Sequence, residues 1–350
     1  MSALARQAER IESSEGRPAG LPRERVVVSV SSLVRRFGEV TAVDGISFEV
    51  RESEIFGFLG PNGAGKSTTI NVLCTLLRPT EGRASVAGID VVADPRRVRR
   101  QIGLVFQDTT LDDYLTAEEN LRFHADLYGV PAELVDERLD AVLKMVDLAD
   151  RQGHLVGTFS GGMKRRLEIA RGLIHSPRVL FLDEPTVGLD PQTRARIWEY
   201  VLELRRAEAT TIFMTTHSME EAERCDRIAI IDNGVLVAID TPDALKATIG
   251  KDRIEIQVDD PRATVAALAD GFGVEAQISE GAVAFYVPGG EQFVPRLFAE
   301  FELPIHSVRV ARPTLDDVFM TYTGRTIRDA EASAGERLRT HARRFRGRTR

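Results

Sequence analysis

The chain has 350 residues, of which 43% are hydrophobic and 28% are charged, and its formal net charge is −7. This composition is typical of a globular protein with room for more than one domain. It excludes a chain that is disordered throughout, a disulfide scaffold and a strongly basic nucleic-acid binder. The sequence contains no apolar run of about 18 residues, so we expect any membrane-spanning part to be supplied by another chain.

The first part of the chain alternates between strand and helix patterns. Residues 1–24 are polar and predict a disordered leader. From residue 25 to 249, short apolar strands such as "EIFGFLG", "QIGLVFQ", "RVLFLDEP" and "TTIFMTTH" are separated by helical patterns. This alternation predicts an α/β domain built on a mainly parallel, covered sheet. Apolar residues at i, i+3 and i+4 predict a helical subdomain inserted at about 108–172.

The second part of the chain has a different pattern. Residues 250–325 follow the order β-α-β-β-α-β and close with a helix, which predicts a small α+β domain of the ferredoxin-like kind. Residues 326–350 are rich in arginine and predict a basic disordered tail. Two interpretations of this tail remain open: an arm in weak contact with anionic lipid, or an inert solvated end.

A phosphate-binding loop follows the strand "EIFGFLG" and precedes a helix. The segment "GPNGAGKST" satisfies G-x-x-x-x-G-K-[ST], in which small residues let backbone N–H groups surround phosphates at a helix N-terminus. We expect Lys66 to reach the β- and γ-phosphates of a nucleotide, and Ser67 to hold Mg²⁺. The residues expected to bind nucleotide in this loop are Gly60, Pro61, Asn62, Gly63, Ala64, Gly65, Lys66, Ser67 and Thr68.

Polar side chains also end three other predicted strands. Ligands bind at the carboxyl ends of parallel strands, so these side chains are candidate site residues. Asp183 is expected in the Mg²⁺ shell, and Glu184 is expected to orient or deprotonate the attacking water. Gln107 is expected to contact the metal or the water, and His217 the γ-phosphate.

These motifs, in this order, resemble those of the ATP-binding cassette (ABC) ATPases from about Val26 to Asp240. The resemblance implies a P-loop cassette with a mixed sheet core and an inserted helical subdomain. It assigns the Walker A loop to 60–68, the Q-loop to Gln107, the signature to Ser160, Gly161 and Gly162, Walker B to Asp183 with Glu184, the D-loop to Asp190, the switch histidine to His217, and the adenine-stacking aromatic to Phe37.

The resemblance also explains why "FSGGMKRR" looks like a second phosphate-binding turn. In this family two cassettes pair head to tail, and the signature of one caps the ATP held by the Walker A loop of the other. A homodimer that binds ATP and Mg²⁺ is therefore implied. Met163 stands where the family commonly has glutamine, which affects a ribose contact and not the capping of phosphate.

Two further segments, "LTAEENLRFHADLYG" and "RPTLDDVFMTYTGR", resemble the daunorubicin-resistance type of ABC exporter ATPase, and this likeness extends to about Arg325. It implies an ATP hydrolase on the cytoplasmic face of the cell membrane. Such an enzyme energises the export of drugs, antibiotics or lipid-like molecules through a separate multi-span permease. The alternatives are a soluble ABC ATPase acting on the ribosome or DNA, and an importer ATPase. We expect no nucleic-acid partner.

Overall fold

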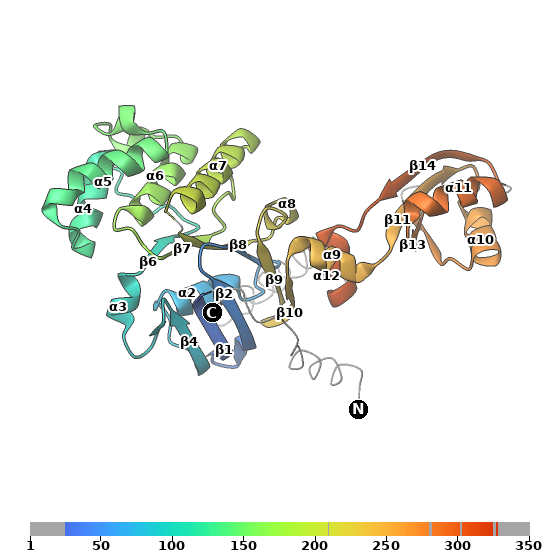
Figure 1. Cartoon of the computed structure of the whole chain (residues 1–350), viewed down its shortest axis with the longest axis horizontal. Coiled ribbons are helices and arrows are strands. Elements are labelled where there is room, and N and C mark those ends of the chain that lie inside the picture. Colours follow the sequence, from blue (N-terminus) through green and yellow to red (C-terminus); the bar gives the residue numbers. More distant parts are fainter. Residues whose placement is uncertain (1–24, 209, 280–281, 302, 325–326, 328–350) are drawn as a thin grey trace, which may run out of the picture.

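The protein is elongated, with a small C-terminal lobe at one end of a larger lobe (Figure 1). The computed structural model describes residues 25–324 and Ile327, apart from residues 209, 280–281 and 302. The leader expected at 1–24 and nearly all of the tail expected at 326–350 lie outside the described residues. Within the described part of the chain, no helix is both long and apolar enough to cross a membrane.

A six-stranded sheet forms the centre of the larger lobe, in the order β10-β9-β3-β8-β7-β6. Five neighbouring strands run parallel, and β10 pairs with β9 in the antiparallel sense, so the predicted mixed sheet is confirmed. Every residue of β3, β7 and β8 is buried, as expected for strands covered on both faces. The strands are β3 (Ile55–Leu59), β6 (Ile102–Val105), β7 (Val179–Asp183), β8 (Thr211–Thr216), β9 (Arg227–Asp232) and β10 (Val235–Asp240).

The two strands that precede β3 in the chain, at Val26–Phe37 and Val40–Arg51, do not join this sheet. They form a separate antiparallel sheet in the order β2-β1-β4-β5, and the prediction of one mainly parallel sheet is wrong for them. Their buried and exposed residues are interleaved, as in a sheet that is covered on one face. The strands are β1 (Val26–Phe37), β2 (Val40–Arg51), β4 (Glu81–Val86) and β5 (Ile89–Asp90).

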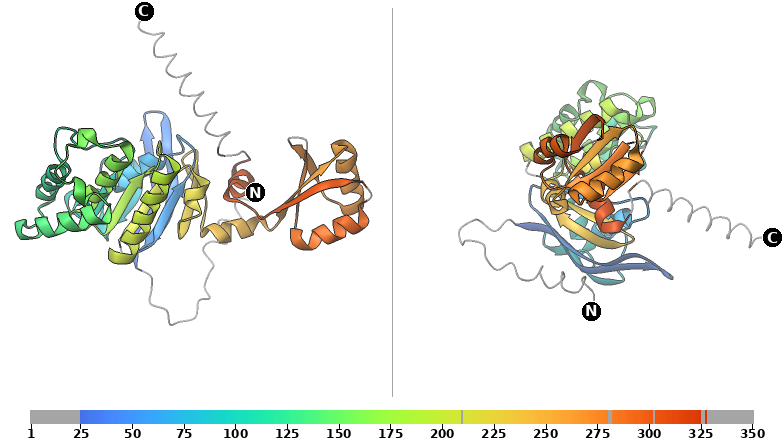
Figure 2. Two further views of the ribbon diagram at one scale, coloured as in Figure 1. Left: turned by 90° about the horizontal axis from the view of Figure 1, so that it is seen from above. Right: turned by 90° about the vertical axis from the view of Figure 1, so that its right-hand side faces the viewer.

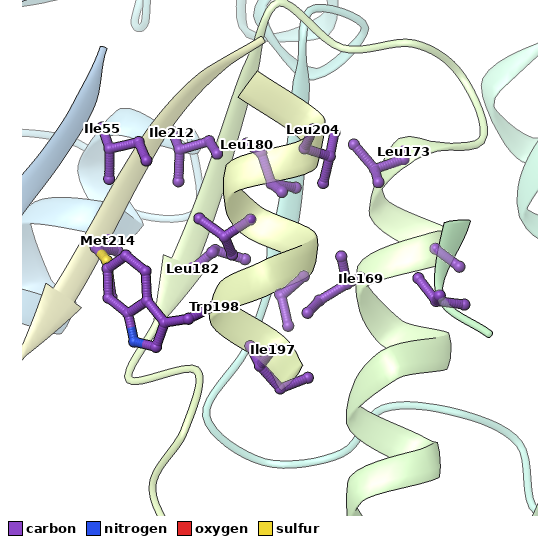
Figure 3. Close-up of a cluster of buried hydrophobic side chains, with 14 of the residues drawn as sticks. Ile55, Ile169, Leu173, Leu180, Leu182, Ile197, Trp198, Leu204, Ile212 and Met214 are labelled. Atoms are coloured by element: carbon purple, nitrogen blue, oxygen red, sulfur yellow. The ribbon is translucent and has the colours of Figure 1, made fainter. Parts of the chain in front are cut away.

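Helices cover both faces of the central sheet (Figures 1 and 2). On one face, Leu180 and Ile212 of the sheet lie near Trp198 and Leu204 of α7 and Ile169 of α6 (Figure 3). The opposite face is packed with phenylalanine rings from β2, β3, β7 and β8. The helices are α2 (Lys66–Leu73), α3 (Pro95–Arg99), α4 (Ala117–Tyr128), α5 (Ala132–Met145), α6 (Gly161–Leu173), α7 (Pro191–Glu208), α8 (Met219–Ala222) and α9 (Pro242–Ile249), with short 3-10 turns at Ala149–Arg151 and Val156–Thr158.

The small lobe has its own sheet and core. Its elements follow the order expected from the sequence, and its antiparallel sheet is arranged β12-β13-β11-β14. After this lobe the chain returns, and Leu315, Val318 and Phe319 of α12 are buried with the core of the larger lobe beside α9. The elements are β11 (Asp252–Val258), α10 (Pro261–Phe272), β12 (Ala276–Ser279), β13 (Ala282–Val287), α11 (Gly290–Glu300), β14 (Ile305–Ala311) and α12 (Leu315–Thr323).

Candidate functional site

The sheet itself gathers the candidate residues. The strands β3, β8, β7 and β6 are adjacent and parallel, so their carboxyl ends meet at one edge. The phosphate loop 60–68 follows β3, and His217 follows β8. Asp183 ends β7 with Glu184 directly after it, and Gln107 comes two residues after β6. Four segments that are far apart in the sequence therefore reach the same edge.

Two glycines of the phosphate loop are required by close backbone contacts. A Cβ atom at Gly60 would lie 2.3 Å from the carbonyl oxygen of Ile231. Gly65 has a φ of 108°, and a Cβ there would lie 2.5 Å from the carbonyl oxygen of Ala42. Only glycine fits both places without moving the backbone. The loop then leads directly into α2, whose first N–H groups are available to an anion.

Lys66 lies inside this loop and is held from two sides. Its Nζ donates hydrogen bonds to the carbonyl oxygens of Gly60 at 2.8 Å and Pro61 at 3.1 Å. The same Nζ is 3.0 Å from Oε1 of Glu184, and both side chains are buried. A buried ammonium pointing into a phosphate loop is suited to bind a phosphate oxygen, and Glu184 is its anionic partner in this structure.

The carboxyl of Glu184 has a lowered pKa. Burial raises the pKa of this carboxyl, but the hydrogen bond with His217 and the charge of Lys66 outweigh that effect and bring the pKa to about 2. His217 Nδ1 is 3.4 Å from Oε2 of Glu184. The backbone of Glu184 has a φ of 47°, in the left-handed region that residues other than glycine rarely adopt.

Ser67 and Asp183 place two oxygen atoms that could coordinate a metal ion close to each other. The Ser67 hydroxyl donates to Oδ1 of Asp183 at 3.2 Å, and the Thr215 hydroxyl donates to the same oxygen at 2.5 Å. A hydroxyl and a carboxylate at this separation are hard ligands of the kind that Mg²⁺ prefers, so the residues present fit that ion.

Three other candidates make no hydrogen bond or ion pair with Lys66, Ser67, Asp183 or Glu184 among the described residues. Gln107 is exposed just beyond β6. Phe37 is 44% exposed at the end of β1, with the guanidinium of Arg35 4.4 Å from its ring centroid. The carboxylate of Asp190 accepts hydrogen bonds from the backbone and hydroxyl of Thr193, so it caps α7. These hydrogen bonds also lower the pKa of Asp190.

Comparison with known proteins identifies the family of this chain. Residues 43–187 match the family model of the ABC transporter. The chain is 40% identical to the daunorubicin resistance ATP-binding protein DrrA2 of Streptomyces coeruleorubidus over an alignment of 317 residues, which covers 87% of this chain and 97% of that protein. The chain belongs to the ATP-binding proteins of ABC transporters. It is an ATP-binding and ATP-hydrolysing subunit.

Other comparisons extend this result to the small lobe. Residues 241–323 match the C-terminal domain of DrrA1-3-like ATP-binding proteins. The chain is also 40% identical to the Nod factor export ATP-binding protein I of Ralstonia nicotianae, over 87% of this chain and 95% of that protein. A solved dimeric ATP-binding cassette, in a post-hydrolysis state with ADP and Pi, superimposes with a TM-score of 0.56 at 28% identity, covering 61% of this chain and 98% of that one.

The residues assigned to the signature lie at the start of α6. Ser160 is exposed and caps α6, where its Oγ accepts a hydrogen bond from the amide of Met163 at 3.3 Å. Gly161 is exposed too, and a Cβ there would have no atom within 4 Å beyond its own helix backbone and neighbouring residues. Within the described part of the chain, no hydrogen bond or ion pair joins Ser160, Gly161 or Gly162 to residues 60–68.

The structure adds site residues that the sequence reasoning missed. Thr215 bridges the site, since its hydroxyl also accepts a hydrogen bond from the amide of Glu184 at 3.0 Å. Glu221 is buried, and its carboxylate accepts hydrogen bonds from the hydroxyls of Thr186 and Thr216. The paired threonines directly before His217, at the end of a buried strand, are the signal that could have pointed to this network.

Proposed function

We propose that this ABC ATPase works as a homodimer that powers a membrane exporter from the cytoplasmic face of the cell membrane. The observation that carries the proposal is the separation of two phosphate-binding elements in one chain. The loop at 60–68 has Lys66, Asp183 and Glu184 beside it, whereas Ser160 starts an exposed helix N-terminus elsewhere. A head-to-tail pair of chains brings the signature of each to the ATP held by the other.

In the proposed site, each side chain has one task. Lys66 and the N–H groups of residues 60–68 bind the phosphates, and Ser67 and Asp183 hold Mg²⁺. When bound, Mg²⁺ neutralises charge on the phosphate oxygens. Glu184 orients and deprotonates the attacking water, and His217 contacts the γ-phosphate.

The Lys66–Glu184 ion pair makes nucleotide binding precede the activation of Glu184 as a base. While the pair is intact, the carboxylate is occupied by the ammonium, and the hydrogen bond with His217 together with the charge of Lys66 holds its pKa at about 2, which makes it a weak base. A nucleotide phosphate that takes over Lys66 removes this partner from the carboxylate. The proton affinity of Glu184 therefore rises when the nucleotide is bound.

Phe37, Gln107 and Asp190 lie outside this cluster, and we propose that they too contact nucleotide or water. Phe37 is exposed on the same hairpin as Ala42, whose carbonyl oxygen lies against Gly65, so its ring is available to stack on a base. Gln107 and Asp190 would contact the site only after rearrangement or across the dimer, as part of a composite site. The ATPase unit is proposed at 25–249 and the small α+β unit at 250–325.

A separate multi-span permease is the proposed membrane partner. The helical subdomain exposes large apolar side chains, since Tyr114 is 91%, Phe123 65% and Leu127 68% exposed. Exposed apolar groups of this size on neighbouring segments are typical of a protein interface. The cargo is proposed to be a drug, antibiotic or lipid-like molecule, because the relatives are named for daunorubicin resistance and Nod factor export.

Purification of the tagged chain in mild detergent tests the partner directly. We expect a stoichiometric multi-span membrane protein to co-purify, and the variant Phe123→Asp to lose it while retaining ATP binding. A matched control is Phe298→Asp, at a 57% exposed phenylalanine of the small lobe. Co-purification of ribosomes, or of no protein at all, would contradict the exporter assignment.

A further inference from the structure

Arg165 is a buried arginine that binds the backbone turn at residues 183–185, which carries Glu184 and is called the catalytic turn below. It belongs to the early part of α6 and is only 6% exposed. Its Nε donates to the carbonyl oxygen of Pro185 at 2.7 Å, and its Nη2 donates to the carbonyl oxygens of Asp183 and Glu184, each at 3.2 Å. One guanidinium therefore binds three consecutive carbonyl groups of the turn that carries Glu184.

The other side of the same guanidinium reaches the segment that follows β6. Nη1 donates to the carbonyl oxygen of Phe106 and pairs with Oε2 of Glu168 at 3.2 Å. The second carboxylate oxygen of Glu168, which is fully buried, accepts a hydrogen bond from the amide of Thr110 at 2.8 Å. Arg165 and Glu168 of α6 thus link three parts of the chain in one buried network. These parts are α6 itself, the segment 106–110 around Gln107, and the catalytic turn.

The catalytic turn needs support of this kind. Glu184 has its backbone in the left-handed region, with a φ of 47°, and such conformations persist only where surrounding contacts hold them. The Thr215 hydroxyl holds the amide of Glu184, and Arg165 holds the carbonyl oxygen of the same residue. A guanidinium offers five donors in a fixed plane, whereas a lysine ammonium offers three donors at one point.

We propose that Arg165 is a positioning residue for ATP hydrolysis, which fixes the backbone turn that aims the Glu184 carboxylate at the phosphate loop. Glu168 binds both this guanidinium and the amide of Thr110. A displacement of the helical subdomain therefore moves Arg165 and changes the orientation of the Glu184 carboxylate. This inference rests on the proposed role of Glu184 as the base, and it predicts an effect on turnover and not on nucleotide binding.

The test is the variant Arg165→Lys in the full-length chain, with Arg166→Lys as its control. Arg166 is the next residue of α6, and it donates instead to the carbonyl oxygens of Val146 and Asp147, away from the catalytic turn. We expect kcat for Mg-ATP to fall on the order of 10- to 100-fold in Arg165→Lys, as for a misplaced catalytic group. The Kd for ATP, measured by calorimetry, should stay within about threefold, and Arg166→Lys should keep the wild-type kcat.

The outcomes separate a positioning role from a purely structural one. A folded Arg165→Lys chain with wild-type kcat would overturn the proposal, as would an equal loss of ATP binding and turnover. If Arg165→Lys does not fold, Glu168→Asp decides, because the shortened carboxylate cannot hold Arg165 and Thr110 together. A lowered kcat with unchanged Kd in Glu168→Asp supports the proposal, and a wild-type kcat overturns it.

Glu184→Gln, assayed in parallel, separates failure of the positioning role of Arg165 from failure of the role of Glu184 as the base. If Glu184→Gln loses turnover while Arg165→Lys keeps it, only the positioning role is overturned. If Glu184→Gln keeps turnover, the assignment of Glu184 itself is refuted, and the proposal for Arg165 falls with it.

Discussion

Replacing Glu184 with glutamine is expected to separate ATP binding from hydrolysis. The carboxylate lies 3.0 Å from Nζ of Lys66, and its pKa of about 2, against an ordinary value of 4.5, corresponds to a preference of roughly 3 kcal/mol for the ionised form. Glutamine keeps the shape of the side chain but can neither accept a proton nor pair with the ammonium. We therefore expect kcat to fall about 10²- to 10⁴-fold.

The same change is expected to strengthen ATP binding by roughly tenfold, because a phosphate no longer competes with a carboxylate for Lys66. Phosphate release gives kcat, calorimetry gives Kd, and gel filtration with ATP reports the dimer, which we expect to persist. Glu203→Gln, at an exposed glutamate of α7, is the control and should behave as the wild type. Wild-type turnover in Glu184→Gln would refute the assignment of the base.

The pH dependence of stability checks the electrostatic part of this reasoning. The folded-state pKa of Glu184 is lowered, so its stabilising contribution is present above about pH 4.5 and is lost as the pH falls towards 2. Relative to Glu184→Gln, the wild type should lose free energy of unfolding as the pH is lowered from about 5 to 3 in urea titrations. A difference that stays constant over this range would contradict the ion pair.

Three further changes test other parts of the site and core. Phe37→Ala should raise the Kd for ATP roughly 5- to 100-fold if its ring stacks on the base, and an unchanged Kd would remove it from the site. Gly60→Ala should abolish ATP binding, because its Cβ would meet the carbonyl oxygen of Ile231 at 2.3 Å, whereas Gly153→Ala, with no atom within 4 Å of its Cβ, should bind normally. Leu180→Ala, fully buried against α7, should lower the free energy of unfolding by about 2–5 kcal/mol in urea, and a smaller loss would contradict the packing in Figure 3.

The sequence predicts the central sheet well because its strands are short, mostly apolar runs. The runs that become β3, β7 and β8 are short and fully buried, and the polar residues that follow them are the candidate site residues. Since parallel strands end at one edge, the strand order alone brings these residues together. The antiparallel sheet could not be predicted in this way, because alternation in one strand does not reveal its partner. Its third strand, "EGRASV", carries no clear strand pattern.

The supporting contacts of the site could not be predicted from local patterns. Arg165 reaches the turn at residues 183–185 across 18 to 20 residues of sequence, through the packing of α6 near the end of β7. In the sequence it reads only as one of the basic residues in "FSGGMKRR". Asp190 shows the converse, because the motif assigns it to the site while local hydrogen bonds hold its carboxylate at the start of α7.

The central claim is that each ATP site is shared between two chains, and a mixed dimer tests it most directly. Lys66→Ala removes the phosphate ligand, Ser160→Arg blocks the exposed signature, and neither variant alone should hydrolyse ATP. When the two are co-expressed and randomly paired, half of the dimers contain one intact composite site, so activity should return to roughly a quarter of the wild-type value. Verified heterodimers that remain inactive would contradict a site shared between the subunits.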